Sequence, residues 1–195
     1  MKIFKTFFIL IFTTVSIISC AQNGNKEIEN QFIGFTNDFI NKNYDSYLKK
    51  MNQTFFEKIK KEDFVTMMKS SYENPMFSIK SEPVIIKSIS NIEKIEDNYY
   101  AEISYSSNID FELDDNLSEE QKKTLNQKFL ESFNLVYGEK NVKNVKVGKI
   151  EIVAHKKAIA NSNNNKDWYF LIMEKRYYES VKDFYPKEII DKYKE

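Results

Sequence analysis

Two of the side-chain types that most often do chemistry occur once each in this sequence. Cys20 is the only cysteine and His155 the only histidine, which excludes an intramolecular disulfide, a cysteine-rich zinc site and a pair of histidine ligands. As a general base, His155 would need an orienting carboxylate, and we expect a half-exposed histidine on a strand instead. The chain has no G-x-S-x-G segment, and its four glycines are too sparse for a phosphate-binding loop. These patterns predict no catalytic, metal-binding or cofactor-binding site.

Three carboxylates near aromatic positions could serve as the acid of a pocket: Asp45, Glu102 and Asp110. Their spacing forms no catalytic pair. Asp45 stands at the start of a predicted helix, where we expect it to cap the helix or face solvent. Glu102 alternates with apolar residues along a predicted strand, so we expect it in solvent as well. Four more acidic residues cluster at the start of a predicted helix: Asp114, Asp115, Glu119 and Glu120. Negative charge is stabilised by the positive end of the helix dipole, so this cluster does not require a bound cation.

Four aromatic residues on predicted strands are candidates for lining a cavity that binds a small apolar ligand: Tyr99, Tyr105, Trp168 and Phe170. The same alternation suits ordinary core packing. We favour packing, and the cavity stays open as the alternative.

The N-terminus has the pattern of an export signal. Lys2 and Lys5 precede an uncharged stretch from Phe7 to Ile18. A helix of 12 residues rises about 18 Å, which is too short to cross a hydrocarbon core of about 30 Å. The length fits the apolar region of a secretory signal peptide.

The segment Ile17-Ile18-Ser19-Cys20 resembles the lipobox of bacterial lipoproteins. The resemblance implies that residues 1–19 are removed by cleavage between Ser19 and Cys20, and that Cys20 carries the acyl chains that hold the protein in a membrane. Residues 20–26 would be the lipidated cysteine and a polar tether. Because Ala21, and not Asp, follows the cysteine, the resemblance also implies the outer membrane, facing the periplasm. The alternative is a plain signal peptide or signal anchor in which Cys20 has no role.

The charge balance argues against nucleic-acid binding. The chain carries 29 basic and 29 acidic side chains, and Lys2 and Lys5 belong to the predicted signal, which leaves 27 basic against 29 acidic side chains. Nucleic-acid affinity depends on a basic surplus. We therefore expect the partners to be the membrane, through the anchor, and a small apolar ligand or an envelope protein.

Residues 27–195 are predicted to form a single α+β domain, in which N-terminal helices pack on a curved, mainly antiparallel sheet with an additional helix between strands. Apolar spacing of three and four residues predicts helices over 27–40, 44–55, 64–72 and 118–137, with a last helix after Pro186. Ser118 and Gln121 form a capping box for the fourth of these helices. Alternating residues predict strands over 76–80, 84–95, 98–108, 143–160, with a bulge at Gly148, and 168–175.

Two segments in this order resemble the nuclear transport factor 2-like, or cystatin-like, α+β cone superfamily: Asn43-Tyr44-Asp45-Ser46-Tyr47-Leu48 and Trp168-Tyr169-Phe170-Leu171. The helix at 118–137 is larger than anything between the strands of the minimal family. The resemblance implies either a non-enzymatic binding module or, as the alternative, an isomerase- or cyclase-like enzyme that uses a pocket carboxylate on a small apolar substrate. A third possibility is a subunit that docks into an envelope assembly by the edge of its last hairpin.

Overall fold

A computed structural model describes residues 24–57, 59–173 and 178–193 and confirms the α+β class. Its elements follow this order: a helix over residues 24–40, α2 (Tyr44–Lys50), η1 (Gln53–Glu57), α3 (Lys61–Tyr72), β1 (Phe77–Ser81), β2 (Ile85–Ile89), β3 (Glu93–Ile95), β4 (Asn98–Leu113), α4 (Glu119–Tyr137), η2 (Glu139–Asn141), β5 (Val142–Lys146), β6 (Lys149–Ser162), β7 (Tyr169–Met173), α5 (Tyr178–Val181), η4 (Lys182–Phe184), α6 (Lys187–Ile190) and η5 (Asp191–Tyr193).

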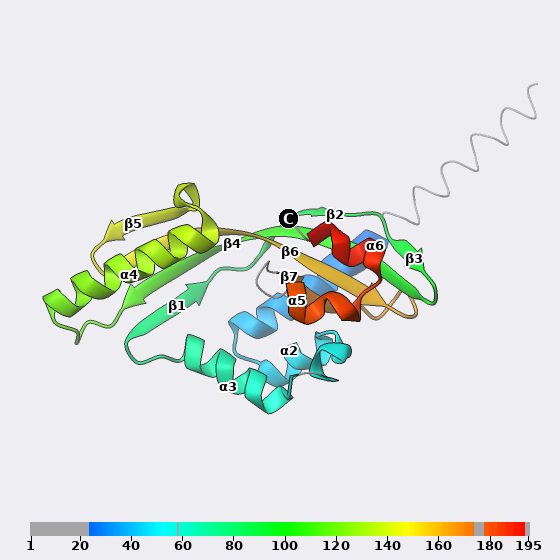
Figure 1. The fold of residues 1–195 in the computed structure, drawn as a ribbon, viewed down its shortest axis with the longest axis horizontal. Helices are drawn as coiled ribbons and strands as arrows, with labels where there is room; N and C mark the ends of the chain where they lie inside the picture. Colours follow the sequence, from blue (N-terminus) through cyan, green and yellow to red (C-terminus); the bar gives the residue numbers. More distant parts are fainter. Residues whose placement is uncertain (1–23, 58, 174–177, 194–195) are drawn as a thin grey trace, which may run out of the picture.

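The sheet is built on one long antiparallel ribbon. Strands β4 and β6 pair from Tyr99↔Ser162 to Glu112↔Lys149. Strands β1, β2 and β3 pair with the outer edge of β4, and β5 and β7 with the outer edge of β6. Figure 1 shows the helices gathered around the two halves of this ribbon.

The predicted bent strand over 143–160 is wrong, because the chain reverses at Gly148. Strands β5 and β6 form a hairpin in which Lys146 pairs with Lys149. Gly148 has φ +85°, a value that glycine adopts without strain in a tight turn. A hairpin turn and a bulge shift the apolar alternation in the same way, so the pattern alone did not separate them.

Other boundaries also shift. The predicted strand 84–95 divides into β2 and β3, and β4 extends beyond 108 to Leu113. The predicted helix 44–55 ends at Lys50, because Met51 bridges to Phe170 and the Asn52 N–H donates to the Phe170 carbonyl at 3.1 Å. Residues 24–26, assigned to the tether, are already helical, and the Cα of Gly24 lies so close to Ile92 that a Cβ there would meet it at 2.8 Å.

The larger of two apolar clusters lies between the N-terminal helices and one half of the ribbon. Phe32 is fully buried, and its ring centroid lies 5.0 Å from that of Tyr105 and 5.3 Å from that of Phe170. Phe35 stacks on Tyr47 of α2 at 4.4 Å. These ring contacts fix the first two helices against β4 and β7.

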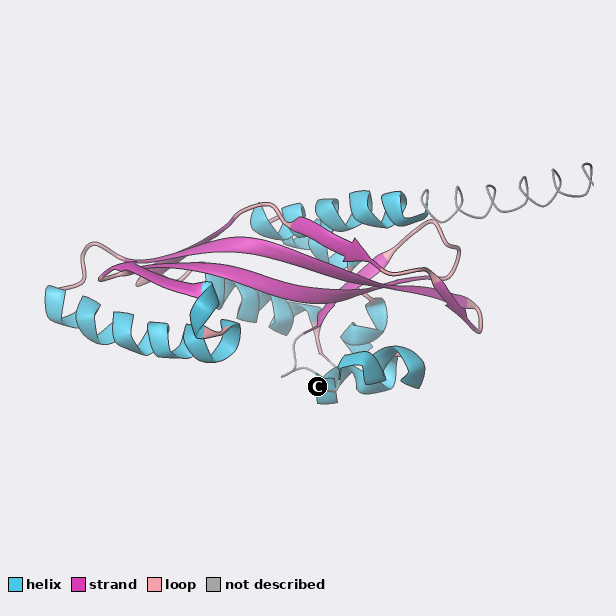
Figure 2. Cartoon of the chain, turned by 90° about the horizontal axis from the view of Figure 1, so that it is seen from above, coloured by secondary structure: helices cyan, strands magenta, loops and turns pink. Residues whose placement is uncertain are grey.

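The smaller cluster lies under α4 at the other end of the ribbon. Its buried members are Phe111, Leu113, Ile150 and Ile152. We call α4, β5, β1 and the paired ends of β4 and β6 the α4 lobe. Figure 2 shows α4 and the helix over 24–40 at opposite ends and on opposite sides of the twisted strands. Ile103 belongs to the larger cluster and Phe111 to the smaller one. The two residues are an even number of positions apart on β4, so in a flat strand their side chains would point to the same side. The right-handed twist of a long ribbon accounts for this change of side.

The C-terminal segment covers the other face of the ribbon near the larger cluster. Tyr185 contacts Tyr100 edge-on, with ring centroids 6.4 Å apart, and Ile189 and Ile190 are buried there. Both faces are therefore covered in this half of the sheet.

Candidate functional site

The four aromatic candidates do not share a cavity wall in the described part of the chain. Tyr105, Trp168 and Phe170 are at most 4% exposed and belong to the larger cluster. Tyr99 is half-buried, with the Lys94 ammonium 5.6 Å from its ring centroid. This placement is core packing, in which the rings of Tyr105 and Phe170 fill the space against Phe32.

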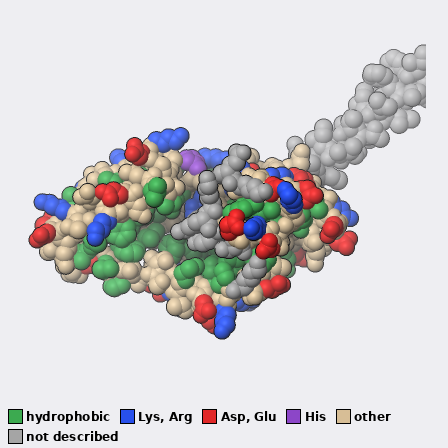
Figure 3. All heavy atoms as spheres, in the orientation of Figure 1, with side chains coloured by type: hydrophobic (Ala, Val, Ile, Leu, Met, Phe, Trp, Pro, Cys, Tyr) green, Lys and Arg blue, Asp and Glu red, His purple; other side chains and the backbone are tan. Residues whose placement is uncertain are grey.

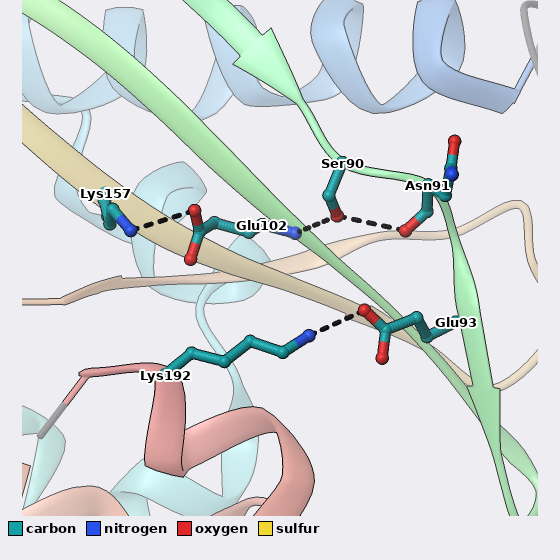
Figure 4. Close-up of polar contacts among 6 residues, drawn as sticks. All are labelled: Ser90, Asn91, Glu93, Glu102, Lys157 and Lys192. Atoms are coloured by element: carbon teal, nitrogen blue, oxygen red, sulfur yellow. Dashed lines mark hydrogen bonds and ion pairs between the residues drawn. The ribbon is translucent and has the colours of Figure 1, made fainter.

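Glu102 does not face open solvent as expected. Its carboxylate lies 3.0 Å from Lys157 Nζ, and its backbone N–H donates to Ser90 Oγ at 2.9 Å (Figure 4). Tyr193 hydrogen-bonds to the same carboxylate. The alternation of apolar and polar residues along β4 placed Glu102 on the outer face of the strand correctly. It gave no sign that the C-terminal segment covers this face.

A second ion pair holds the C-terminal segment beside Glu102. Lys192 Nζ lies 2.6 Å from the Glu93 carboxylate, as Figure 4 shows. Burial, followed by the charge of Glu102, raises the pKa of Tyr193, and burial raises the pKa of Tyr185. The charged groups here are paired with one another, and these contacts hold the C-terminal segment on the sheet.

The remaining sequence candidates lie apart from the aromatic core. Asp45 is exposed on α2, Asp110 is exposed opposite Glu151, and His155 is exposed opposite Ser106. Asp45 makes no cap, because Asn43 holds that position in α2. Within residues 24–57, 59–173 and 178–193, no group of His, Cys, Asp or Glu could hold a metal ion.

The acidic residues before α4 serve the start of that helix. Ser118 Oγ accepts from the Gln121 N–H, and Gln121 Oε1 accepts from the Ser118 N–H. Asp114 accepts from the Asn116 N–H at 2.8 Å, and Asp115 pairs with Lys122 at 3.3 Å. The predicted capping box is confirmed.

An aromatic surface, only half-buried, extends along the α4 lobe. The ring of Phe129 lies 4.5 Å from that of Phe111 and 5.4 Å from that of Phe77, and Phe77, Phe129 and Phe133 are all part-exposed. In the last turn of α4, Leu135 is 89% exposed and Val136 58%, and neither packs against the described residues of the smaller cluster. Figure 3 shows hydrophobic side chains gathered at this end of the molecule, over α4 and β1.

A surface pocket, which we call the α2–α3 pocket, lies between α2 and α3. It has a volume of about 470 Å³ and is lined by Lys42, Asn43, Tyr44, Asp45, Ser46, Lys49, Val65 and Lys69. Among these residues, only Asp45 is a site candidate from the sequence alone. The three lysines come from the turn before α2, from α2 and from α3, and their meeting has no signal in a sequence so rich in lysine.

The N-terminus of the described chain and the α4 lobe lie at opposite ends of the molecule (Figure 1). Strand β4 has 16 residues, which span about 50 Å at roughly 3.3 Å per residue. The candidate lipidation and cleavage residues, Cys20 and Ser19, lie outside the described residues. No helix in the described ranges has both the length and the apolar character needed to cross a membrane.

No protein-family model matches the chain, and comparisons with curated proteins and with solved structures likewise find no match.

Proposed function

We propose that the protein is a lipid-anchored envelope protein whose folded domain is a non-enzymatic interaction module. Cys20 would carry the lipid after removal of residues 1–19, with the domain in the periplasm and the anchor in the outer membrane. The lipobox-like segment and the apolar stretch before it support the anchor. The cone superfamily remains the proposed relationship of the fold.

The single observation that carries the interaction role is the half-buried aromatic surface of the α4 lobe. Ten partly buried apolar side chains surround only four buried ones in this cluster. A contiguous apolar surface of this kind is typical of an interaction site. By contrast, the enzymatic alternative requires an acid beside the aromatic wall, and Asp45, Glu102 and Asp110 lie elsewhere in the described structure.

An envelope protein fits this surface better than the membrane does. Gly24 lies four positions after Cys20, a reach of at most about 14 Å, so the anchored end and the lobe are separated by most of the ribbon. A membrane-binding helix has a polar face rich in Lys and Arg. The exposed charges of α4 have both signs: Glu119, Glu120, Lys123, Lys128 and Glu131.

The anchor is tested by substitution of the cysteine. Cys20→Ser should release the protein from the membrane fraction and abolish labelling with radioactive palmitate. A variant that stays fully membrane-bound and acylated would show that the lipoprotein proposal is wrong.

The interaction role is tested by site-specific photo-crosslinking in cells. A photoreactive amino acid at position 133, whose part-exposed ring packs on Phe111, should give an adduct with a defined envelope protein, and the same group at position 112, exposed on the outer face of β4, should not. A Val136→Ser variant, at an exposed position one turn after Phe133 on the same side of α4, should weaken binding to that partner without a change in melting temperature. Equal adducts from both positions, or none from position 133, would contradict the proposal.

A further inference from the structure

The α2–α3 pocket combines positive charge with hydrogen-bonding groups and an apolar wall. Lys42, Lys49 and Lys69 line it together with one acid, Asp45. Its volume of about 470 Å³ lies in the range typical of sites for small ligands. We propose that this pocket binds a small organic phosphate, a role separate from the interaction surface of the α4 lobe.

The charge of the pocket is only weakly neutralised by the protein itself. Lys42 lies 3.9 Å from Glu73, and both side chains are about half exposed, so this pair contributes little. The Glu73 carboxylate also accepts a hydrogen bond from Tyr44 Oη at 3.2 Å. Within the described part of the chain, Lys49 and Lys69 lie in no ion pair with a carboxylate. Two ammonium groups are thus available to an anion.

Lys42 occupies a position where the backbone favours glycine. The Asn43 N–H donates to the Asp38 carbonyl at 2.8 Å and the Lys42 N–H to the Phe39 carbonyl at 3.0 Å, which is the hydrogen-bond pattern of a Schellman motif. Lys42 is its left-handed residue, with φ +61°. A long basic side chain at this position lines the pocket in spite of the backbone cost.

The lining also indicates the chemical class of the ligand. Lysine binds phosphate as a point charge, whereas planar carboxylate recognition favours the arginine fork, and the described lining of the pocket contains lysines and no arginine. The Tyr44 ring, with Lys69 Nζ 5.8 Å from its centroid, and Val65 form an apolar wall. Asn43 and Ser46 can bond hydroxyl groups. A phosphate on a short hydroxylated carbon skeleton satisfies all three features.

The proposal is tested by calorimetric titration of residues 20–195 carrying Cys20→Ser, which retains every described residue and does not depend on lipidation. Glycerol 3-phosphate should bind saturably, and glycerol should not. Lys49→Gln and Lys69→Gln should each weaken binding by about threefold to tenfold. Lys123→Gln, an exposed lysine of α4, is the matched control and should change nothing.

Lys42→Gly separates binding from folding. It should weaken glycerol 3-phosphate binding while the melting temperature stays constant or rises, because glycine relieves the left-handed backbone. Vesicles of phosphatidylcholine with phosphatidic acid distinguish the source of the phosphate. Vesicle binding that depends on Lys49 and Lys69, without binding of glycerol 3-phosphate, assigns the site to a lipid headgroup. No binding of either probe, or binding that the Lys49→Gln and Lys69→Gln variants retain, would overturn the proposal.

Discussion

Asn126 Oδ1 accepts a 2.8 Å hydrogen bond from the backbone N–H of Gly148, which ties the middle of α4 to the turn between β5 and β6. Asn126 is only 6% exposed. The Gly148 carbonyl in turn accepts from the Leu113 N–H at 2.8 Å. One buried amide therefore fixes how the helix, the hairpin turn and the end of β4 meet in the α4 lobe.

Asn126→Ala should lower the free energy of unfolding by about 1–3 kcal/mol, because it leaves the buried Gly148 N–H without a partner. Urea unfolding monitored by circular dichroism measures this change. Gln127→Ala is the matched control: the Gln127 amide donates to Glu131 on the exposed side of α4, so we expect a change within about 0.5 kcal/mol. Similar losses in both variants would show that the buried bond has no special role.

Two glycine-to-alanine substitutions should change the free energy of unfolding in opposite directions. Gly148→Ala places a side chain at φ +85° and 3.5 Å from the Leu113 Cβ, which should destabilise the fold by about 1–2 kcal/mol. Gly34→Ala adds a methyl group with no atom within 4 Å, inside the helix over 24–40, and should stabilise it by about 0.5–1 kcal/mol. Melting temperatures of the two variants test this difference. A rise for both would mean that the turn does not require the left-handed conformation.

Local signals predicted α4 well because they lie within a few residues of one another. Ser118 and Gln121 are three positions apart, and the apolar residues from Leu125 to Phe133 lie on one helix face. The predicted end of the helix at residue 137 is also confirmed, and Gly138 follows it with φ +84°. These features depend on chain chemistry alone.

Features made by contacts distant in sequence escaped prediction. Glu102 lies beneath Tyr193, which is 91 positions away along the chain, and Met51 leaves its helix to bridge Phe170. The alternation of apolar residues around Gly148 fits a bulge and a turn equally, and only the pairing between β5 and β6 distinguishes the two. The α2–α3 pocket arises in the same way, because Lys49 and Lys69 meet only after α2 and α3 pack.

Ser118→Ala should destabilise the protein by about 1 kcal/mol through loss of the cap of α4. Because this helix covers the smaller cluster, amide hydrogen exchange should increase first in residues 119–123. A matched Ser132→Ala variant, at an exposed position later in the helix, should exchange like the original protein. Unchanged exchange at the helix start in Ser118→Ala would contradict the role of the capping box.

The C-terminal segment should make the fold sensitive to alkali. Burial raises the pKa of Tyr185 and, with Glu102, that of Tyr193 above the ordinary value near 10. The unfolded chain then releases these protons first, so the stabilisation is complete below about pH 10 and is lost as the pH rises above it.

Urea titrations between pH 8 and pH 11 measure this dependence. Between pH 10 and pH 11, each of the two tyrosines should reduce the free energy of unfolding by about 1 kcal/mol. Tyr193→Phe removes one ionisable group, so the variant should be less stable than the original chain at pH 8, where it lacks the hydrogen bond to Glu102, and should lose less stability on alkalinisation. The two curves should converge by pH 11. Parallel curves would mean that Tyr193 ionises as easily in the folded protein as in the unfolded one, and that its contact with Glu102 does not hold the C-terminal segment on the sheet.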